Sequence, residues 1–154
     1  MSLSITLIPL AITVLMVAKQ ASEDVSEKLK ESQIKNIPCD IETIFTDSTL
    51  LHKTLFEHGM SVTEVDDNNI KATCPESSLA FTRSNSAEPF HLKLSSSQEI
   101  DALKSDLDDL REEYGFNVQS FTYEHVKENL DDGMTIESEE VLDDNSILLT
   151  INLN

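Results

Sequence analysis

The feature that most constrains this chain is an N-terminal run without charge, since no Asp, Glu, Lys or Arg precedes Lys19. From Leu3 to Ala18 the residues are mostly large and aliphatic, with one serine and two threonines among them. As a helix, this segment is apolar on every side and has to be buried in lipid or in protein. We therefore expect an apolar membrane-anchor or assembly helix over residues 1–18. Its contact residues are expected to be Leu7, Leu10, Val14 and Val17.

Two interpretations of this helix stay open, and a third fits less well. A membrane-spanning helix needs roughly 17 to 25 apolar residues, so the run is of marginal length for an anchor. Lysines follow from Lys19 onward, and the positive-inside bias then places the C-terminal domain in the cytoplasm. Alternatively, the helix packs against copies of itself in a cytoplasmic oligomer. A signal peptide is disfavoured because no basic residue precedes the run and no small-residue cleavage motif ends it.

The composition divides the rest of the chain into a stalk and a globular domain. Residues 19–37 are rich in Lys, Glu and Ser. Their apolar residues Ala21, Val25 and Leu29 form one narrow stripe, which predicts a charged helical stalk. Pro38 ends this helix, because the residue before a proline avoids the α conformation. Residues 38–154 are long enough to bury the core of one domain.

Charge limits the partners of this domain. The 154 residues carry a formal net charge of −18. Nucleic acid and anionic membrane surfaces are polyanions, so neither is expected to bind the globular part. A protein partner or self-association fits better, and the acidity also keeps a small domain soluble. No small-molecule substrate is evident from the sequence.

Hydrophobic periodicity predicts an α+β fold with a mainly antiparallel sheet and helices packed on one face, preceded by the N-terminal apolar helix. Strands are expected at residues 40–45, 61–65, 70–74, 78–83, 90–94, 134–142 and 147–153. One helix is expected after Thr46-Asp47-Ser48, with Gly59 as its C-cap. Two more are expected between Ser95 and Leu130, separated at Gly115.

The C-terminal half also carries a recognisable series of motifs. They are Glu113-Tyr114-Gly115, the run Tyr123 to Leu130, Gly133-Met134-Thr135-Ile136-Glu137 and Asp143-Asp144-Asn145-Ser146. The series resembles the small uncharacterised family named for hypothetical chloroplast open reading frame thirty-five, in which a Tyr-bearing helix leads through a Gly to a hairpin. The resemblance extends over roughly residues 41–153, including the Leu-rich helix that stops at Gly59, and implies the α+β fold. Asn145 stands where the family favours Gly, and the apolar N-terminus lies outside the pattern. The family has no established activity, so no functional residue is carried over.

Cysteine and histidine spacing matches no metal or redox motif. Cys39 and Cys74 form no CxxC pair and are expected to pack in the fold; a disulfide is the alternative if the domain is exported. The four histidines are His52, His58, His91 and His125. None of them belongs to an i, i+4 pair or an HExxH motif, so structural or solvent-facing roles are expected.

Acidic and glycine-rich patterns also lack a catalytic or cofactor signature. The carboxylates from Asp106 to Glu113 fall within a helical period and do not match an EF-hand loop, so a solvated helix face is expected. The three glycines are each placed at a predicted element end and leave no phosphate-binding loop. No cofactor and no metal ion is therefore expected.

The leading hypothesis from the sequence is a non-enzymatic interaction module, anchored in a membrane or self-assembling through its N-terminal helix. A second hypothesis is an enzyme whose site is assembled from dispersed residues such as His91, His125 and Cys39 or Cys74. A third is an inhibitor of a basic protein that imitates a polyanion with its acidic helix face.

Overall fold

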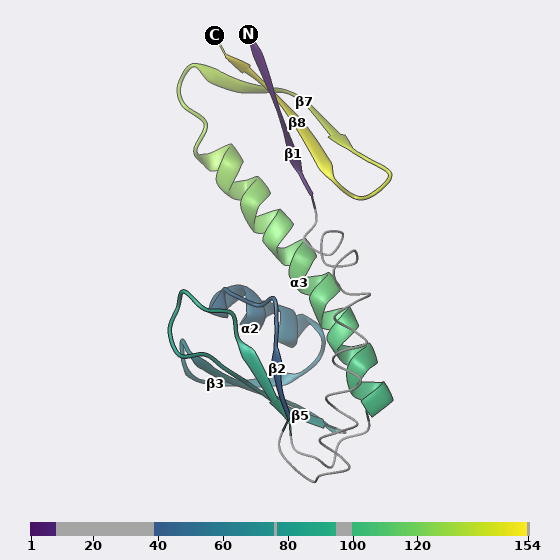
Figure 1. The fold of residues 1–154 in the computed structure, drawn as a ribbon. Helices are drawn as coiled ribbons and strands as arrows, with labels where there is room; N and C mark the ends of the chain where they lie inside the picture. Colours follow the sequence, from purple (N-terminus) through teal and green to yellow (C-terminus); the bar gives the residue numbers. More distant parts are fainter. Residues whose placement is uncertain (9–38, 76, 95–99, 154) are drawn as a thin grey trace.

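The protein folds into two sheets joined by one long helix (Figure 1). The structure is a computed structural model and describes residues 1–8, 39–75, 77–94 and 100–153. The strands are β1 Ser2–Leu7, β2 Cys39–Glu42, β3 Ser61–Asp66, β4 Asn69–Cys74, β5 Ser77–Thr82, β6 His91–Leu94, β7 Met134–Val141 and β8 Ile147–Leu153. The helices are α2 Ser48–Glu57 and α3 Ile100–Glu128.

Antiparallel pairing, as predicted, runs through both sheets, but the strands divide between them. The five-stranded sheet has the order β2-β6-β5-β4-β3, and the three-stranded sheet has the order β1-β8-β7. We call the five-stranded sheet with α2 and residues 100–115 of α3 the large lobe. We call the three-stranded sheet with residues 116–128 of α3 the small lobe. Both chain ends lie on the small lobe, at the end of the molecule far from the large lobe (Figure 1).

The large lobe contains the main hydrophobic core. Alternate residues of β4 and β5, such as Ile70 and Phe81, turn inward and are fully buried. Leu55 of α2 and Leu110 of α3 are buried in the same cluster. Two edge-to-face ring contacts lie in this core: the centroid of the Phe45 ring is 5.7 Å from that of Phe81 and 4.9 Å from that of Tyr114. Helices and sheet thus share one hydrophobic core.

Local signals predicted most of the large lobe correctly. The hairpin of β3 and β4 and the two strands that follow are confirmed within a few residues. Asp47 caps α2, because its carboxylate accepts the Leu50 N–H at 2.9 Å. Gly59 follows the helix with φ of 85°, a left-handed conformation that favours glycine.

Helix α3 is continuous through Gly115, so the prediction of two helices separated there is wrong. Glycine inside a helix costs only about 1 kcal/mol, which packing on both sides outweighs. Gly115 is buried, and the buried face of the helix rotates near it. Leu107 and Leu110 face the large lobe, whereas Gln119 reaches the small sheet. One uninterrupted apolar stripe was therefore absent from the sequence although the helix is continuous.

The N-terminal helix predicted for residues 1–18 is also wrong for residues 2–7, which form strand β1. This strand pairs antiparallel with β8, with Ser2 opposite Asn152 and Leu7 opposite Ile147. Serine or threonine alternates with leucine or isoleucine along β1, which is the period-two pattern of a strand with one apolar face. Leu7 therefore lies in a sheet and not on a lipid-facing helix.

The other residues of that expectation are not covered by the structure. Leu10, Val14, Val17 and the predicted stalk over residues 19–37 lie outside the described residues. Neither α2 nor α3, the helices in the described part, is both long and apolar enough to cross a membrane.

Candidate protein-binding surface

The small sheet has one apolar face and one hydroxyl-rich face. Register places Leu3 beside Ile151 and Ile5 beside Leu149 on the apolar side. The opposite face carries the side chains of Ser2, Ser4, Thr6, Thr150 and Asn152. Leu149 and Ile151 are buried, so the apolar face encloses a small second core.

Helix α3 is held against this apolar face by polar contacts. The buried Gln119 amide donates to the carbonyl oxygens of Leu7 at 3.0 Å and Asn145 at 2.8 Å. One side chain therefore ties the helix to β1 and to the β7–β8 turn. The Tyr123 hydroxyl donates to Glu139 Oε2 at 2.6 Å and ties the helix to β7. In that turn Asn145 has φ of 63°, the left-handed conformation that asparagine tolerates.

Apolar side chains remain exposed around this lobe. Phe121 of α3 is 58% exposed and Val141 of β7 is 65% exposed. The Phe121 ring lies parallel to the His125 imidazole, with centroids 6.1 Å apart. Phe116 and Leu3 are also exposed, at 37% and 50%. Each of these side chains would lose contact with water if a partner covered this lobe, which makes them candidate contact residues.

The same lobe is strongly acidic. Residues 116–154 contain nine Asp and Glu residues but only one Lys or Arg, Lys127. All nine carboxylate side chains are exposed. Lys127 Nζ lies 4.9 Å from the centre of the Tyr123 ring. The Tyr123 hydroxyl, with smaller contributions from Glu124 and Glu139, raises the pKa of Lys127, and the single cation is thereby engaged within the lobe.

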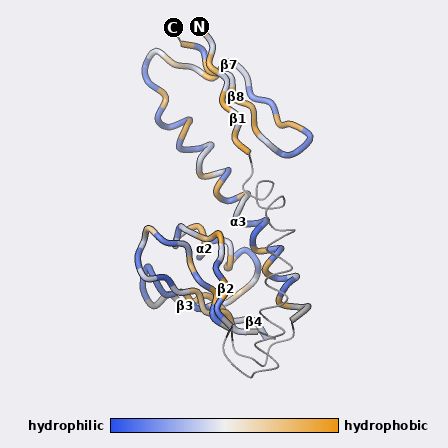
Figure 2. The backbone as a smooth tube through the Cα atoms, viewed as in Figure 1, coloured by the Kyte–Doolittle hydropathy of each residue, from blue (hydrophilic) through white to orange (hydrophobic). Residues whose placement is uncertain are grey.

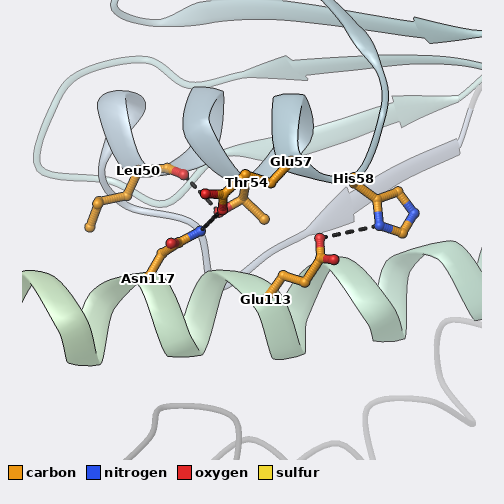
Figure 3. A network of polar contacts seen from close by, with 6 residues as sticks. All are labelled: Leu50, Thr54, Glu57, His58, Glu113 and Asn117. Atoms are coloured by element: carbon orange, nitrogen blue, oxygen red, sulfur yellow. Dashed lines mark hydrogen bonds and ion pairs between the residues drawn. The ribbon is translucent and has the colours of Figure 1, made fainter.

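A second polar cluster, between α2 and α3, serves as a structural joint (Figure 3). Asn117 Nδ2 donates to Thr54 Oγ1 at 3.0 Å and to Glu57 Oε2 at 2.9 Å. The Thr54 hydroxyl in turn donates to the Leu50 carbonyl at 2.7 Å. About one helical turn away, His58 Nδ1 lies 3.2 Å from Glu113 Oε2. These contacts hold α2 and α3 together, and the polar groups that make them are already paired within the protein.

The dispersed residues of the enzymatic hypothesis are not brought together. His91 is on β6 in the large lobe, where its Nδ1 lies 2.9 Å from Asp40 Oδ1. His125 is near the end of α3 in the small lobe. Cys39 begins β2 and Cys74 ends β4, with β6 and β5 between these strands.

The cluster at Asp40 is an exposed ion pair. Partial burial raises the pKa of Asp40, but hydrogen bonds and charge from Lys93 and His91 outweigh that effect and lower it. Lys93 Nζ lies 3.0 Å from Asp40 Oδ2, and both side chains are about half exposed. Among the described residues, no group of three or more His, Cys, Asp and Glu side chains is placed to hold a metal ion.

Comparisons of the chain with protein-family models, with curated proteins and with solved structures find no match. The surface therefore has to be interpreted from its own chemistry. Sequence reasoning recognised the acidity and predicted β7 and β8 within a residue or two, but it missed that they form a separate sheet with β1, because it assigned β1 to a helix. The alternation of Ser4, Ile5, Thr6 and Leu7 was the signal that could have revealed the strand.

Proposed function

We propose that this protein is a non-enzymatic interaction module whose small lobe binds a protein partner with basic groups. The observation that carries the proposal is the exposure of Phe121 and Val141 on a lobe with nine carboxylates and one lysine. Apolar anchors supply most of the affinity of protein interfaces when they are buried centrally. Surrounding charge speeds association and selects partners of opposite sign.

The exposed aromatic side chains distinguish this proposal from simple polyanion mimicry. An inhibitor that only imitates nucleic acid needs carboxylates, and its binding disappears as salt screens them. Phe121 adds a ring that gains free energy when a partner removes it from water. Binding by this lobe should therefore weaken with salt but retain a component that depends on Phe121.

The test is affinity isolation with the full chain as bait, comparing wild type with Phe121→Ser. Phe56→Ser is the matched control, because Phe56 is also largely exposed, at 69% against 58% for Phe121, but lies on α2 in the large lobe. Wild type and the control should recover the same partner, and Phe121→Ser should lower its recovery about tenfold, a loss of 1.4 kcal/mol. Equal recovery by Phe121→Ser and wild type would remove the small lobe from the interaction.

A salt series with the recovered partner separates the two modes of binding. If the interface is packed around Phe121, wild type should retain more of the partner than Phe121→Ser at every salt concentration. If both release the partner at the same concentration, the carboxylates act alone and the polyanion-mimic hypothesis is favoured.

A further inference from the structure

The four edge strands of the two sheets differ in how they are protected. Natural proteins guard sheet edges with charges, bulges or very short strands, because an open edge pairs with other chains. Edge β2 has four residues and contains Asp40 and Glu42. Edges β3 and β7 each contain an irregularity in their register, and each carries at least two acidic residues.

Edge β1 has none of these protections. Its sequence, Ser-Leu-Ser-Ile-Thr-Leu, has no charge and no proline, and its register with β8 is regular over all six residues. Figure 2 shows the contrast, with strongly hydrophilic residues along the β7–β8 hairpin and none along β1. Among the described residues, β1 pairs with β8 alone. It is therefore the edge best suited to bind another strand.

The backbone of β1 offers a defined set of groups to that strand. The Leu153 N–H donates to the Met1 carbonyl at 2.8 Å, which fixes the phase of the ladder. In an antiparallel pair, successive residues of a strand direct their backbone N–H and C=O groups alternately toward the partner strand and away from it. Leu3, Ile5 and Leu7 thus direct their N–H and C=O groups to β8. Ser2, Ser4 and Thr6 direct theirs away from the sheet.

We infer that β1 pairs antiparallel with β1 of a second copy of this chain, with Ser4 on the twofold axis. Ser4 then exchanges two backbone hydrogen bonds with Ser4 of the second copy, and Ser2 lies opposite Thr6. On the apolar face Leu3 lies opposite Ile5 of the second copy, so its half-exposed side chain becomes covered. The two three-stranded sheets become one sheet of six strands.

Charge opposes the approach of a second copy least at β1, which carries no charged side chain. The chain carries a net charge of −18, so two copies repel one another over most of their surfaces. Strand β1 lets them meet along an uncharged line. The hydroxyl-rich faces then also align, placing serine and threonine opposite one another across the new pair. Because one strand pair is a small interface, the dimer should dissociate on dilution.

A charge-swap experiment tests this pairing in the full chain. Wild type should sediment at twice the 17.2 kDa of one chain, and Ser4→Ala should do the same. Ser4→Glu alone and Ser4→Lys alone should each sediment as monomers, because like charges then face each other across the axis. An equimolar mixture of the two should recover the doubled mass. Circular dichroism of each variant verifies that the exposed substitution leaves the fold intact.

Any of three results would overturn the inference. They are a monomeric wild type at all concentrations, a Ser4→Glu variant that stays dimeric, and a mixture that stays monomeric. The first would mean that β1 is covered by its own chain or left open.

Hydrogen exchange locates the contact independently of mutation. The outward amides of Ser4 and Thr6 should exchange at least about tenfold more slowly in the dimer than after dilution to monomer. Rapid exchange of both amides in a dimeric sample would place the interface elsewhere. The inference is separable from the proposed partner binding, since Phe121→Ser should leave the dimer mass unchanged.

Discussion

The two lobes of this protein differ in what they bury and in what they show to solvent. The large lobe fully buries Phe45, Phe81, Phe90 and Tyr114 around one core. Among the small lobe's strands, only Leu149 and Ile151 are buried apolar residues. Exposed Phe121, Val141 and Leu3 belong to the small lobe, whereas among the described residues of the large lobe Phe56 is the large apolar residue that is exposed. The large lobe therefore holds most of the buried apolar side chains, and the small lobe leaves more of its large apolar side chains in solvent.

The long helix explains how one small chain supports two lobes that differ so much in burial. The first half of α3 contributes Leu103, Leu107 and Leu110 to the large core. The second half uses a different face to hold the small sheet through Gln119 and Tyr123. The small lobe can therefore leave apolar side chains uncovered, since its helix is already anchored elsewhere.

The largest expected effect is on the large core. Leu110→Ala should lower the free energy of unfolding by about 2–5 kcal/mol, because it removes buried methyl groups and leaves a cavity. Urea unfolding followed by circular dichroism measures the loss. The control Phe56→Ala removes an exposed side chain and should change stability by less than about 0.5 kcal/mol. Similar values for the two variants would contradict the placement of Leu110.

The matching change in the small lobe should act locally. Leu149→Ala should cost about 2 kcal/mol, at the lower end of such substitutions, because fewer neighbours surround the cavity. Native-state hydrogen exchange should show faster exchange in β1, β7 and β8 while β4 and β5 keep their protection. Equal loss of protection in both sheets would show that the lobes unfold as one unit.

The two tyrosines provide a smaller, paired comparison. The buried Tyr114 hydroxyl accepts the N–H groups of Thr46 at 3.1 Å and Asp47 at 3.0 Å. Tyr114→Phe leaves both donors without this partner and should cost about 1–3 kcal/mol. Tyr123→Phe should cost less than about 0.5 kcal/mol, because water can replace its hydroxyl at the exposed Glu139. Urea unfolding of both variants checks the order, and a larger loss at Tyr123 would reverse the comparison.

The smallest expected effect is acid sensitivity shared by both lobes. The Ser146 backbone N–H and side chain lower the pKa of Asp144 in the small lobe. In the large lobe, Asn68 and Asn69 lower the pKa of Asp66, and Lys93 and His91 lower that of Asp40 against the opposing effect of burial.

Acid should destabilise the protein, because the pKa values of these aspartates are lower in the folded state than in the unfolded chain. These carboxylates stabilise the fold above their ordinary pKa of 3.8, and the contribution is lost as pH falls through the lower folded values. The urea midpoint should therefore drop between about pH 5 and about pH 3. Asp144→Asn should reduce that drop, and an unchanged pH profile would show that Asp144 contributes nothing.

Local sequence signals predicted the parts that depend on neighbouring residues. Asp47 and Gly59 marked the ends of α2. Alternation predicted the strands on either side of each turn. The acidic surface could also be inferred, because charge needs no tertiary contact to be counted. The exposed position of Phe121 could not be inferred from the sequence, since its spacing from other apolar residues resembles that of a core residue.

The sequence by itself thus determined most strands, the capped helix α2 and the negative sign of the surface charge. Tertiary structure decided between helix and strand for residues 2–7, whose alternation is compatible with a strand, because β8, their pairing partner, lies at the opposite end of the chain. It also decided that α3 continues through Gly115, since packing against two lobes stabilises the helix where local propensity favours a break. Both outcomes depend on contacts between distant segments. An apolar run without charge is compatible with a helix or a strand until its partner is in place.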